Sequence, residues 1–207
     1  WLTPGAHARG HAGCSSQTGS ERLAAMTALP QLKPPALSDN TAGELVVSWE
    51  HYHRLIEHLA LQLHQAAADF DQIVALSRGG LRVGDLLSRL FDRPLVVMAA
   101  SSYSGDGDRI QGQLKLGHQL AHTCDQLGPR LLLVDDLVDS GTTLVEASAW
   151  LNNQVRPTQL LTGVLWLKGG SHFQPDFWAM ELPENPWIVQ PFERWELLQP
   201  GELEPMS

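Results

Sequence analysis

The chain is poor in cysteine, with only Cys14 and Cys124 among its 207 residues. Two cysteines so far apart make neither a disulfide framework nor the spacing of a metal site, and they fit a reducing compartment. No apolar run is long enough to cross a membrane, and the first residues lack the apolar core of a signal peptide. We therefore expect a cytoplasmic protein with no stable membrane insertion.

Positive charge is also scarce, because 14 Lys and Arg stand against 23 Asp and Glu, for a formal net charge of −9. An acidic chain of this kind is a poor partner for nucleic acid or for an anionic membrane. The mean charge disfavours an anionic substrate as well, unless a few local cations override it. The positions of individual arginines and lysines therefore matter more than the total.

Small residues and prolines dominate residues 1–42, which we expect to be a disordered or non-native N-terminal extension. Residues 43–207 suit one α/β domain. In them, short apolar runs alternate with helical patterns, which predicts a central, mostly parallel sheet flanked by helices. The expected strands are 45–47, 73–76, 94–98, 131–134, 160–167 and 177–180, and the expected helices begin at 49, 81 and 143.

The most informative stretch is an apolar run that ends in three acids. Residues 131–134 have the pattern of a strand buried on both faces, and Asp135, Asp136 and Asp139 follow at its carboxyl end. In a parallel sheet this is the edge at which ligands bind. Adjacent strand residues point to opposite faces, so only one of Asp135 and Asp136 should reach a ligand directly unless the strand frays.

A turn of small residues follows the acids and leads into a helical pattern. It consists of Ser140, Gly141, Thr142 and Thr143. Backbone N–H groups and hydroxyls at a helix start form a ready anion site. Acids beside an anion site require a cation or a sugar between them, and a phosphorylated sugar with Mg²⁺ meets both demands.

Two other groups stand at predicted strand ends. The first is the turn Ser77-Arg78-Gly79-Gly80, in which the glycines let backbone N–H groups approach an anion and Arg78 can pair with a phosphate. The second is Lys168, which ends the strand that follows the acid-bearing one. Taken alone, the first group would more simply be a plain strand-to-helix turn.

These segments together resemble the type I phosphoribosyltransferases, and most closely their bacterial xanthine–guanine branch, over roughly residues 45–193. The resemblance implies an enzyme that transfers the 5-phosphoribosyl group from phosphoribosyl pyrophosphate (PRPP) to a 6-oxopurine. The products would be a nucleoside 5′-monophosphate and pyrophosphate, as in purine salvage. The resemblance also implies a homodimer or homotetramer.

The resemblance assigns roles to the residues of the donor site. Asp135 and Asp136 would serve the ribose hydroxyls and the Mg²⁺ of PRPP, and Asp139 would handle the proton on N7 of the purine. The turn 140–143 would hold the 5′-phosphate. The turn 77–80, which in this family often contains a cis non-proline peptide, would hold the pyrophosphate.

The purine site is implied by the spacing from Lys168 to Trp187 and Ile188. By resemblance, the lysine bonds the purine O6, the tryptophan stacks on the base, and residue 188 offers backbone groups to the purine 2-position. One departure stands here, since Gly-Gly-Ser follows Lys168 where the branch usually has Pro-Ala-Gly.

The polar, glycine-rich segment at about 101–115 is expected to be a flexible loop. By resemblance it closes as a hood over PRPP, with Ser102 and Tyr103 at its start and Arg109 against the pyrophosphate. Closure of such a loop would exclude water from a charged sugar intermediate.

Alternative interpretations remain open. The acids could form a solvated turn, and Asp139 could be a helix N-cap. The chain could be a phosphoribosyltransferase for another base, or a non-catalytic PRPP-sensing regulator that binds nucleic acid on the same fold. Guanine, xanthine and hypoxanthine are equally compatible with the sequence.

Overall fold

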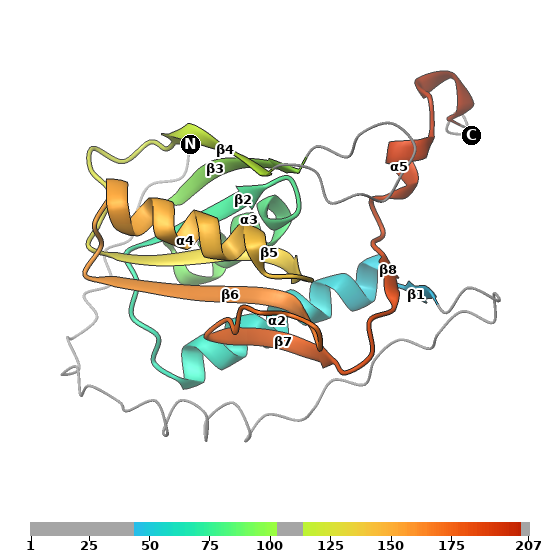
Figure 1. Cartoon of the computed structure of the whole chain (residues 1–207), viewed down its shortest axis with the longest axis horizontal. Coiled ribbons are helices and arrows are strands. Elements are labelled where there is room, and N and C mark those ends of the chain that lie inside the picture. Colours follow the sequence, from blue (N-terminus) through green and yellow to red (C-terminus); the bar gives the residue numbers. More distant parts are fainter. Residues whose placement is uncertain (1–43, 103–113, 204–207) are drawn as a thin grey trace, which may run out of the picture.

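The computed structural model describes residues 44–102 and 114–203 (Figure 1). The elements run β1 (Glu44–Val46), α2 (Trp49–Gln65), β2 (Gln72–Ser77), α3 (Gly80–Phe91), β3 (Leu95–Ser102), β4 (Leu114–Ala121), β5 (Arg130–Val138), α4 (Thr142–Gln154), β6 (Gln159–Lys168), β7 (Phe177–Leu182), β8 (Trp187–Val189), α5 (Arg194–Leu197) and the 3-10 helix η1 (Pro200–Glu202). No helix in these two ranges has the length and apolarity to span a membrane. The predicted extension 1–42 lies outside the described residues.

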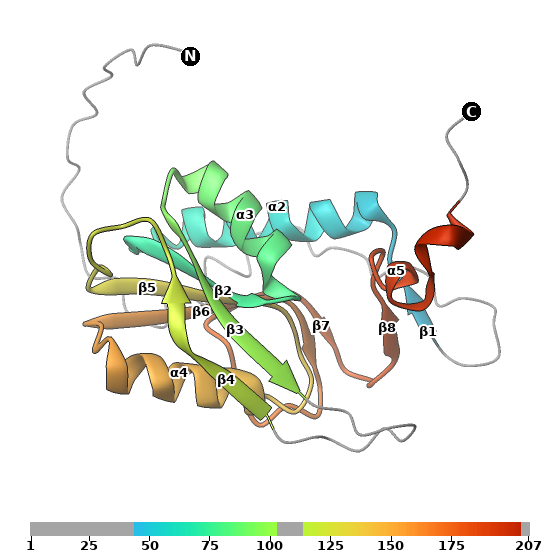
Figure 2. The same ribbon diagram turned by 90° about the horizontal axis from the view of Figure 1, so that it is seen from above.

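Within the described residues, six strands form the central sheet in the order β4-β3-β2-β5-β6-β7. Neighbouring strands are parallel except β3 and β4, which pair antiparallel at one edge. Helices α2 and α3 cover one face of the sheet, and α4 covers the other (Figures 1 and 2). The predicted α/β domain with a mostly parallel sheet flanked by helices is therefore confirmed.

Helix α2 begins where the sequence predicts it. Ser48 caps it by accepting a hydrogen bond from the backbone N–H of His51 at 3.1 Å. The helix residues predicted to face the core are all buried, namely Tyr52, Ile56, Leu59 and Leu63. The apolar period of this segment thus fixes both the helix and the face that it packs on the sheet.

Strand β5 is longer than predicted. It continues past Val134 to Val138, so Asp135 and Asp136 lie within the strand rather than after it. It pairs with β6 as far as Val138 but with β2 only as far as Val134. The edge of β5 that faces β2 therefore has no strand partner at the level of the acids, although β2 itself continues along β3 as far as Ser77.

Two strands were not predicted. β4 starts at Leu114 and β3 extends to Ser102, so both ends of the segment 101–115 belong to strands and not to a loop. β8 pairs parallel with β1 in a separate two-stranded sheet beside α5 (Figure 2). β4 was missed because the segment that contains it was interpreted as a polar loop. A three-residue strand such as β8 is too short to show an alternating pattern of apolar and polar residues.

Helix α3 lies against the sheet at Gly84. A Cβ on this residue would lie 2.6 Å from the Cβ of Ala75 and 2.9 Å from the Cδ1 of Leu95. Glycine therefore sets how closely α3 approaches β2 and β3, and this distance determines where the turn that precedes α3 lies.

We expect Gly84→Val to lower the free energy of unfolding by about 1–3 kcal/mol, because the added side chain overpacks the contact between helix and sheet. Urea denaturation followed by circular dichroism measures the change. Gly201→Val is the matched control, since a Cβ on Gly201 would meet no atom within 4 Å. Equal stability of the two variants would contradict this account of the packing.

Candidate active site

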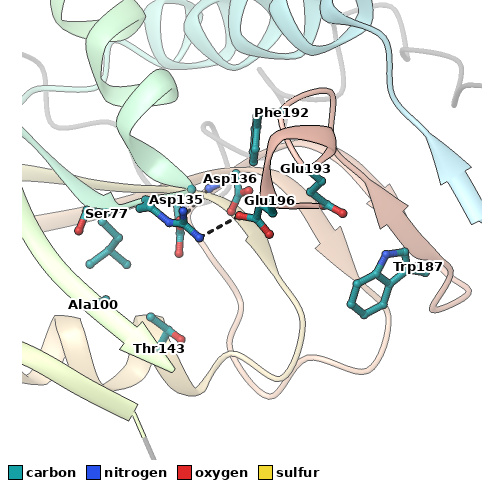
Figure 3. Close-up of a pocket in the computed structure, with 12 residues that line it drawn as sticks. Ser77, Ala100, Asp135, Asp136, Thr143, Trp187, Phe192, Glu193 and Glu196 are labelled. Atoms are coloured by element: carbon teal, nitrogen blue, oxygen red, sulfur yellow. Dashed lines mark hydrogen bonds and ion pairs between the residues drawn. The ribbon is translucent and has the colours of Figure 1, made fainter. Parts of the chain in front are cut away.

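A cavity of about 430 Å³ opens at the carboxyl ends of the central strands (Figure 3). Its walls are formed by the end of β2 and the turn after it, by β3, β5 and α4, and by the segment that follows β7. Its lining residues are Leu76, Ser77, Arg78, Gly79, Ala100, Asp135, Asp136, Thr143, Trp187, Phe192, Glu193 and Glu196. Segments far apart in the sequence thus meet at the edge where parallel sheets bind ligands.

The turn between β2 and α3 lies directly against the acid-bearing end of β5. The peptide bond between Ser77 and Arg78 is cis. A Cβ on Gly79 would overlap the carboxylate of Asp136, and a Cβ on Gly80 would lie 2.5 Å from the carbonyl oxygen of Val134. Both positions therefore require glycine for the turn to lie this close to the strand.

Asp135 and Asp136 both line the cavity. The carboxylate of Asp135 accepts a hydrogen bond from the backbone N–H of Asp136 at 2.9 Å and another from that of Gly80. The Oδ2 atom of Asp136 lies 3.5 Å from the Nε2 of Gln190. The cavity lining thus includes both carboxylates, although adjacent residues of a strand point to opposite faces.

Burial raises the pKa of both carboxyl groups. The pKa of Asp135 lies well above its usual value because of burial first and the charge of Asp136 second. Burial raises the pKa of Asp136 to about 6, and the charge of Glu193 adds to the effect. A cation between these oxygens would relieve the cost of ionising them.

The two carboxylates are suitable ligands for Mg²⁺, which prefers hard oxygen donors and keeps several waters or substrate oxygens. Within residues 44–102 and 114–203, no cluster of three or more His, Cys, Asp and Glu side chains is arranged to hold a metal. A magnesium ion here would depend on oxygens of the substrate as well as on Asp135 and Asp136.

Lys168 and Asp139 form an ion pair at the ends of β6 and β5. The Nζ of the lysine lies 3.4 Å from the Oδ2 of the aspartate, and the two side chains are 7% and 57% exposed. They directly follow the last register pair of the two strands, Val138 with Leu167. The N-cap of α4 is Gly141, so the alternative reading of Asp139 as that cap is wrong.

The turn before α4 packs against the segment that follows Lys168. Gly141 has a φ of 90°, and a Cβ on it would lie 2.5 Å from the Cβ of Phe173. The backbone N–H of His172 donates to the carbonyl oxygen of Ser140 at 3.0 Å. The N-cap Gly141 makes no side-chain hydrogen bond to α4, and the backbone N–H of Thr142 donates to the Oγ of Ser140 at 3.3 Å. A helix start of this kind can bind an anion.

Residues 48–196 match the sequence profile of the phosphoribosyl transferase domain. The chain belongs to this family. A xanthine-guanine phosphoribosyltransferase of Idiomarina loihiensis is 32% identical over 151 residues, which is 72% of this chain and 87% of that protein. A xanthine-guanine phosphoribosyltransferase of Gluconobacter oxydans is 30% identical over 161 residues, or 77% of this chain and 90% of that one.

Solved structures of the family have the same fold. A purine phosphoribosyltransferase from Pyrococcus horikoshii aligns with a TM-score of 0.59 at 25% identity, over 72% of this chain and 93% of that chain. The xanthine-guanine-hypoxanthine phosphoribosyltransferase of Helicobacter pylori aligns with a TM-score of 0.60 at 22% identity, over 74% and 97%. The expected family, fold and enzyme class, a phosphoribosyltransferase, are therefore confirmed.

Most of the site residues predicted from the sequence line two neighbouring cavities of this phosphoribosyltransferase. The main cavity is lined by Ser77, Arg78, Gly79, Asp135, Asp136, Thr143 and Trp187. A smaller hollow of about 210 Å³ adjoins it and includes Asp139, Ser140 and Gly141.

The other predicted site residues lie elsewhere. Ile188 is buried on β8, and Thr142 is exposed at the start of α4. Ser102 is the last residue of β3. Tyr103 and Arg109 lie outside the described residues, so their predicted roles in the hood stay predictions.

Sequence reasoning missed the contribution of the segment after β8. Phe192, Glu193 and Glu196 complete the wall of the cavity, and the ion pair between Glu196 and Arg78 joins this segment to the turn after β2 (Figure 3). Gln190 is buried, its backbone N–H donates to a carboxylate oxygen of Glu193 at 3.1 Å, and its side chain approaches Asp136. The two glutamates, one at the N-cap of the four-residue helix α5 and one within it, were the feature of the sequence that could have indicated this role.

We expect the pH dependence of stability to report the burial of Asp136. Folding raises the pKa of this carboxyl from 3.8 to about 6, so the folded protein binds more protons between these values. The contribution of this carboxyl to the free energy of unfolding is therefore fully present below pH 3.8 and is lost as the pH rises through 6.

The free energy of unfolding of Asp136→Asn, relative to that of wild type, should therefore rise by about 1–3 kcal/mol between acidic and neutral pH. Melting curves in EDTA at several pH values measure the difference. Asp125→Asn, an exposed position between β4 and β5, is the control for a change of one charge. A difference between Asp136→Asn and wild type that does not vary with pH would show that the buried carboxyl is not the cause.

Proposed function

We propose that this phosphoribosyltransferase joins PRPP to a 6-oxopurine (guanine, xanthine or hypoxanthine) and releases pyrophosphate and the nucleoside 5′-monophosphate, a reaction of purine salvage. The observation that carries the proposal is the cavity itself, in which the acid-bearing strand and the glycine turn face Trp187 across one space. The two bacterial relatives named xanthine-guanine phosphoribosyltransferase support the choice of base. The proposal concerns the domain 43–207 and assigns no role to residues 1–42.

The donor would lie along the carboxyl edge of the sheet. The turn 77–80 and the guanidinium of Arg78 would bind the pyrophosphate, with the N–H of Gly80 kept by the carboxylate of Asp135. The turn 140–143 would bind the 5′-phosphate. Asp135 and Asp136 lie between these two turns, where the ribose hydroxyls would be. This order, with Arg78 and its turn at one end, the start of α4 at the other and carboxylates in the middle, matches a sugar that carries phosphates at both ends.

The proposal includes Mg²⁺ as the cofactor. Asp135 and Asp136 would hold it together with oxygens of the donor. When bound, the ion supplies positive charge that stabilises the pyrophosphate as it leaves. The raised pKa of both carboxyls supports this assignment, because partly buried acids that resist ionisation are stabilised by a neighbouring cation.

The purine would lie between Trp187 and the Lys168–Asp139 pair. The side chain of Trp187 is 56% exposed, and a base stacked on an aromatic ring gains about 1–3 kcal/mol. Burial of the lysine side chain fixes its ammonium group, which can donate to O6 of an oxopurine. The backbone of Ile188 would contact the 2-position.

In the reaction, the bond from C1′ to the pyrophosphate oxygen breaks and N9 of the purine bonds to C1′. Asp139 would accept the proton from N7 as that bond forms, and its exposed carboxylate leaves room for the base. The remaining residues hold the two reactants in line, which is how positioning and fixed charges lower such barriers. By resemblance we also propose a homodimer or homotetramer.

We expect Asp139→Asn to lower kcat at least a hundredfold, as for loss of a group that takes up a proton, while the Kd of PRPP changes little. Steady-state assays with the three oxopurines and titration with PRPP measure the two quantities. Asp125→Asn controls for the change of charge. Unchanged turnover would remove Asp139 from the mechanism.

We expect Lys168→Met to raise the KM of each oxopurine roughly ten- to a hundredfold, since a hydrogen bond from a charged donor is worth about 1.5–3 kcal/mol. Methionine keeps the length of the buried chain and removes only the ammonium group. The KM of PRPP should stay near the wild-type value. Wild-type KM values for all three bases would show that the purine lies elsewhere.

A further inference from the structure

The arginine that the proposed function assigns to pyrophosphate is already paired. Nη2 of Arg78 lies 2.9 Å from Oε1 of Glu196, a residue of α5 that is 118 positions further along the chain (Figure 3). Among the lining residues that the structure describes, Arg78 is the only lysine or arginine. Three lining residues besides Glu196 are acidic, namely Asp135, Asp136 and Glu193. Glu196 thus neutralises the one cationic side chain in the wall of the cavity.

Glu196 is held in this place by contacts that do not involve its own charge. The guanidinium of Arg82, one helical turn after Arg78, lies 4.5 Å from the ring centre of Phe192 and 5.6 Å from that of Trp49. The ring of Trp195 lies 5.8 Å from the ring of Trp49. These aromatic and cation–π contacts fasten the segment 192–196 to α2 and α3.

The ion pair itself is weak and accessible. The side chains of Arg78 and Glu196 are 81% and 49% exposed, and exposed pairs contribute little to stability. A second hollow of about 500 Å³, which includes Arg82 and Trp195, lies on the other side of the pair. A ligand or a displaced carboxylate therefore has room on either side of it.

A diphosphate is a stronger partner for a guanidinium than a carboxylate is. It carries more negative charge and can bond two N–H groups of Arg78 at once. A ligand of low charge gains too little from Arg78 to displace Glu196. The same carboxylate is close enough to pair with Arg78 again when the diphosphate leaves.

We propose that Glu196 is a specificity-determining residue that exchanges with the diphosphate group on Arg78, so that it lowers the affinity of the site for PRPP and pyrophosphate and favours release of the product. This inference rests on the proposed function, since it takes the turn 77–80 as the diphosphate site.

The experiment is calorimetric titration of the full chain with inorganic pyrophosphate in excess Mg²⁺. Glu196→Gln removes the charge and keeps the shape, so it should lower the Kd of pyrophosphate about two- to fivefold, the equivalent of one exposed ion pair. The KM of PRPP should fall by a similar factor while the KM of guanine stays unchanged. In a protein that already carries Arg78→Gln, adding Glu196→Gln should leave the Kd of pyrophosphate unchanged.

The matched control is Glu50→Gln. It removes a similarly exposed glutamate–arginine pair, Glu50 with Arg54 at 2.8 Å on α2, outside the lining of both cavities. Equal or weaker binding of pyrophosphate by Glu196→Gln would overturn the exchange and leave the proposed function standing. Pyrophosphate that binds neither the variant nor wild type would overturn the proposed function and the exchange together.

Discussion

The close contact between the turn at Gly79 and Gly80 and the end of β5 is the constraint on which the site depends. Beyond Val134 the edge of β5 has no partner on the β2 side, and the turn into α3 lies against the acids there, where only glycine lets it come so near. The amide of Gly80 then bonds the carboxylate of Asp135. The same approach helps to bury both carboxyls, and burial raises their pKa. One contact therefore shapes the turn that we propose as an anion site and favours a cation next to it.

The two cationic side chains of the proposed site that the structure describes are paired with carboxylates before any ligand binds. Arg78 pairs with Glu196, and Lys168 pairs with Asp139. This arrangement explains how a chain with a net charge of −9 can serve an anionic donor, because the cations are local and held in place. The two pairs differ in burial: the exposed arginine can change partners at little cost, whereas the buried lysine keeps its position and suits a fixed contact with a base.

The sequence predicts the parts of the site that are local in the chain. The acids, the turn 140–143 and the glycine turn each lie within one short segment, and apolar periods locate the strands before them. Contacts between distant segments left no such pattern, and these include the pair between Arg78 and Glu196 and the wall built by Phe192. The unpaired edge of β5 was also hidden, because strand length alone does not reveal where a neighbouring strand turns away.

The segment 187–196 connects the two halves of the cavity. Trp187 at its start faces the proposed purine site, and Glu196 at its end pairs with Arg78, the arginine of the proposed donor site. Between them, Gln190 approaches Asp136. The segment is fixed at one end by the pairing of β8 with β1 and at the other by the aromatic contacts of Trp195. Because both ends are anchored, a shift of Arg78 toward a diphosphate displaces the side chain of Glu196 more readily than the backbone, and the stacking surface for the base stays in place.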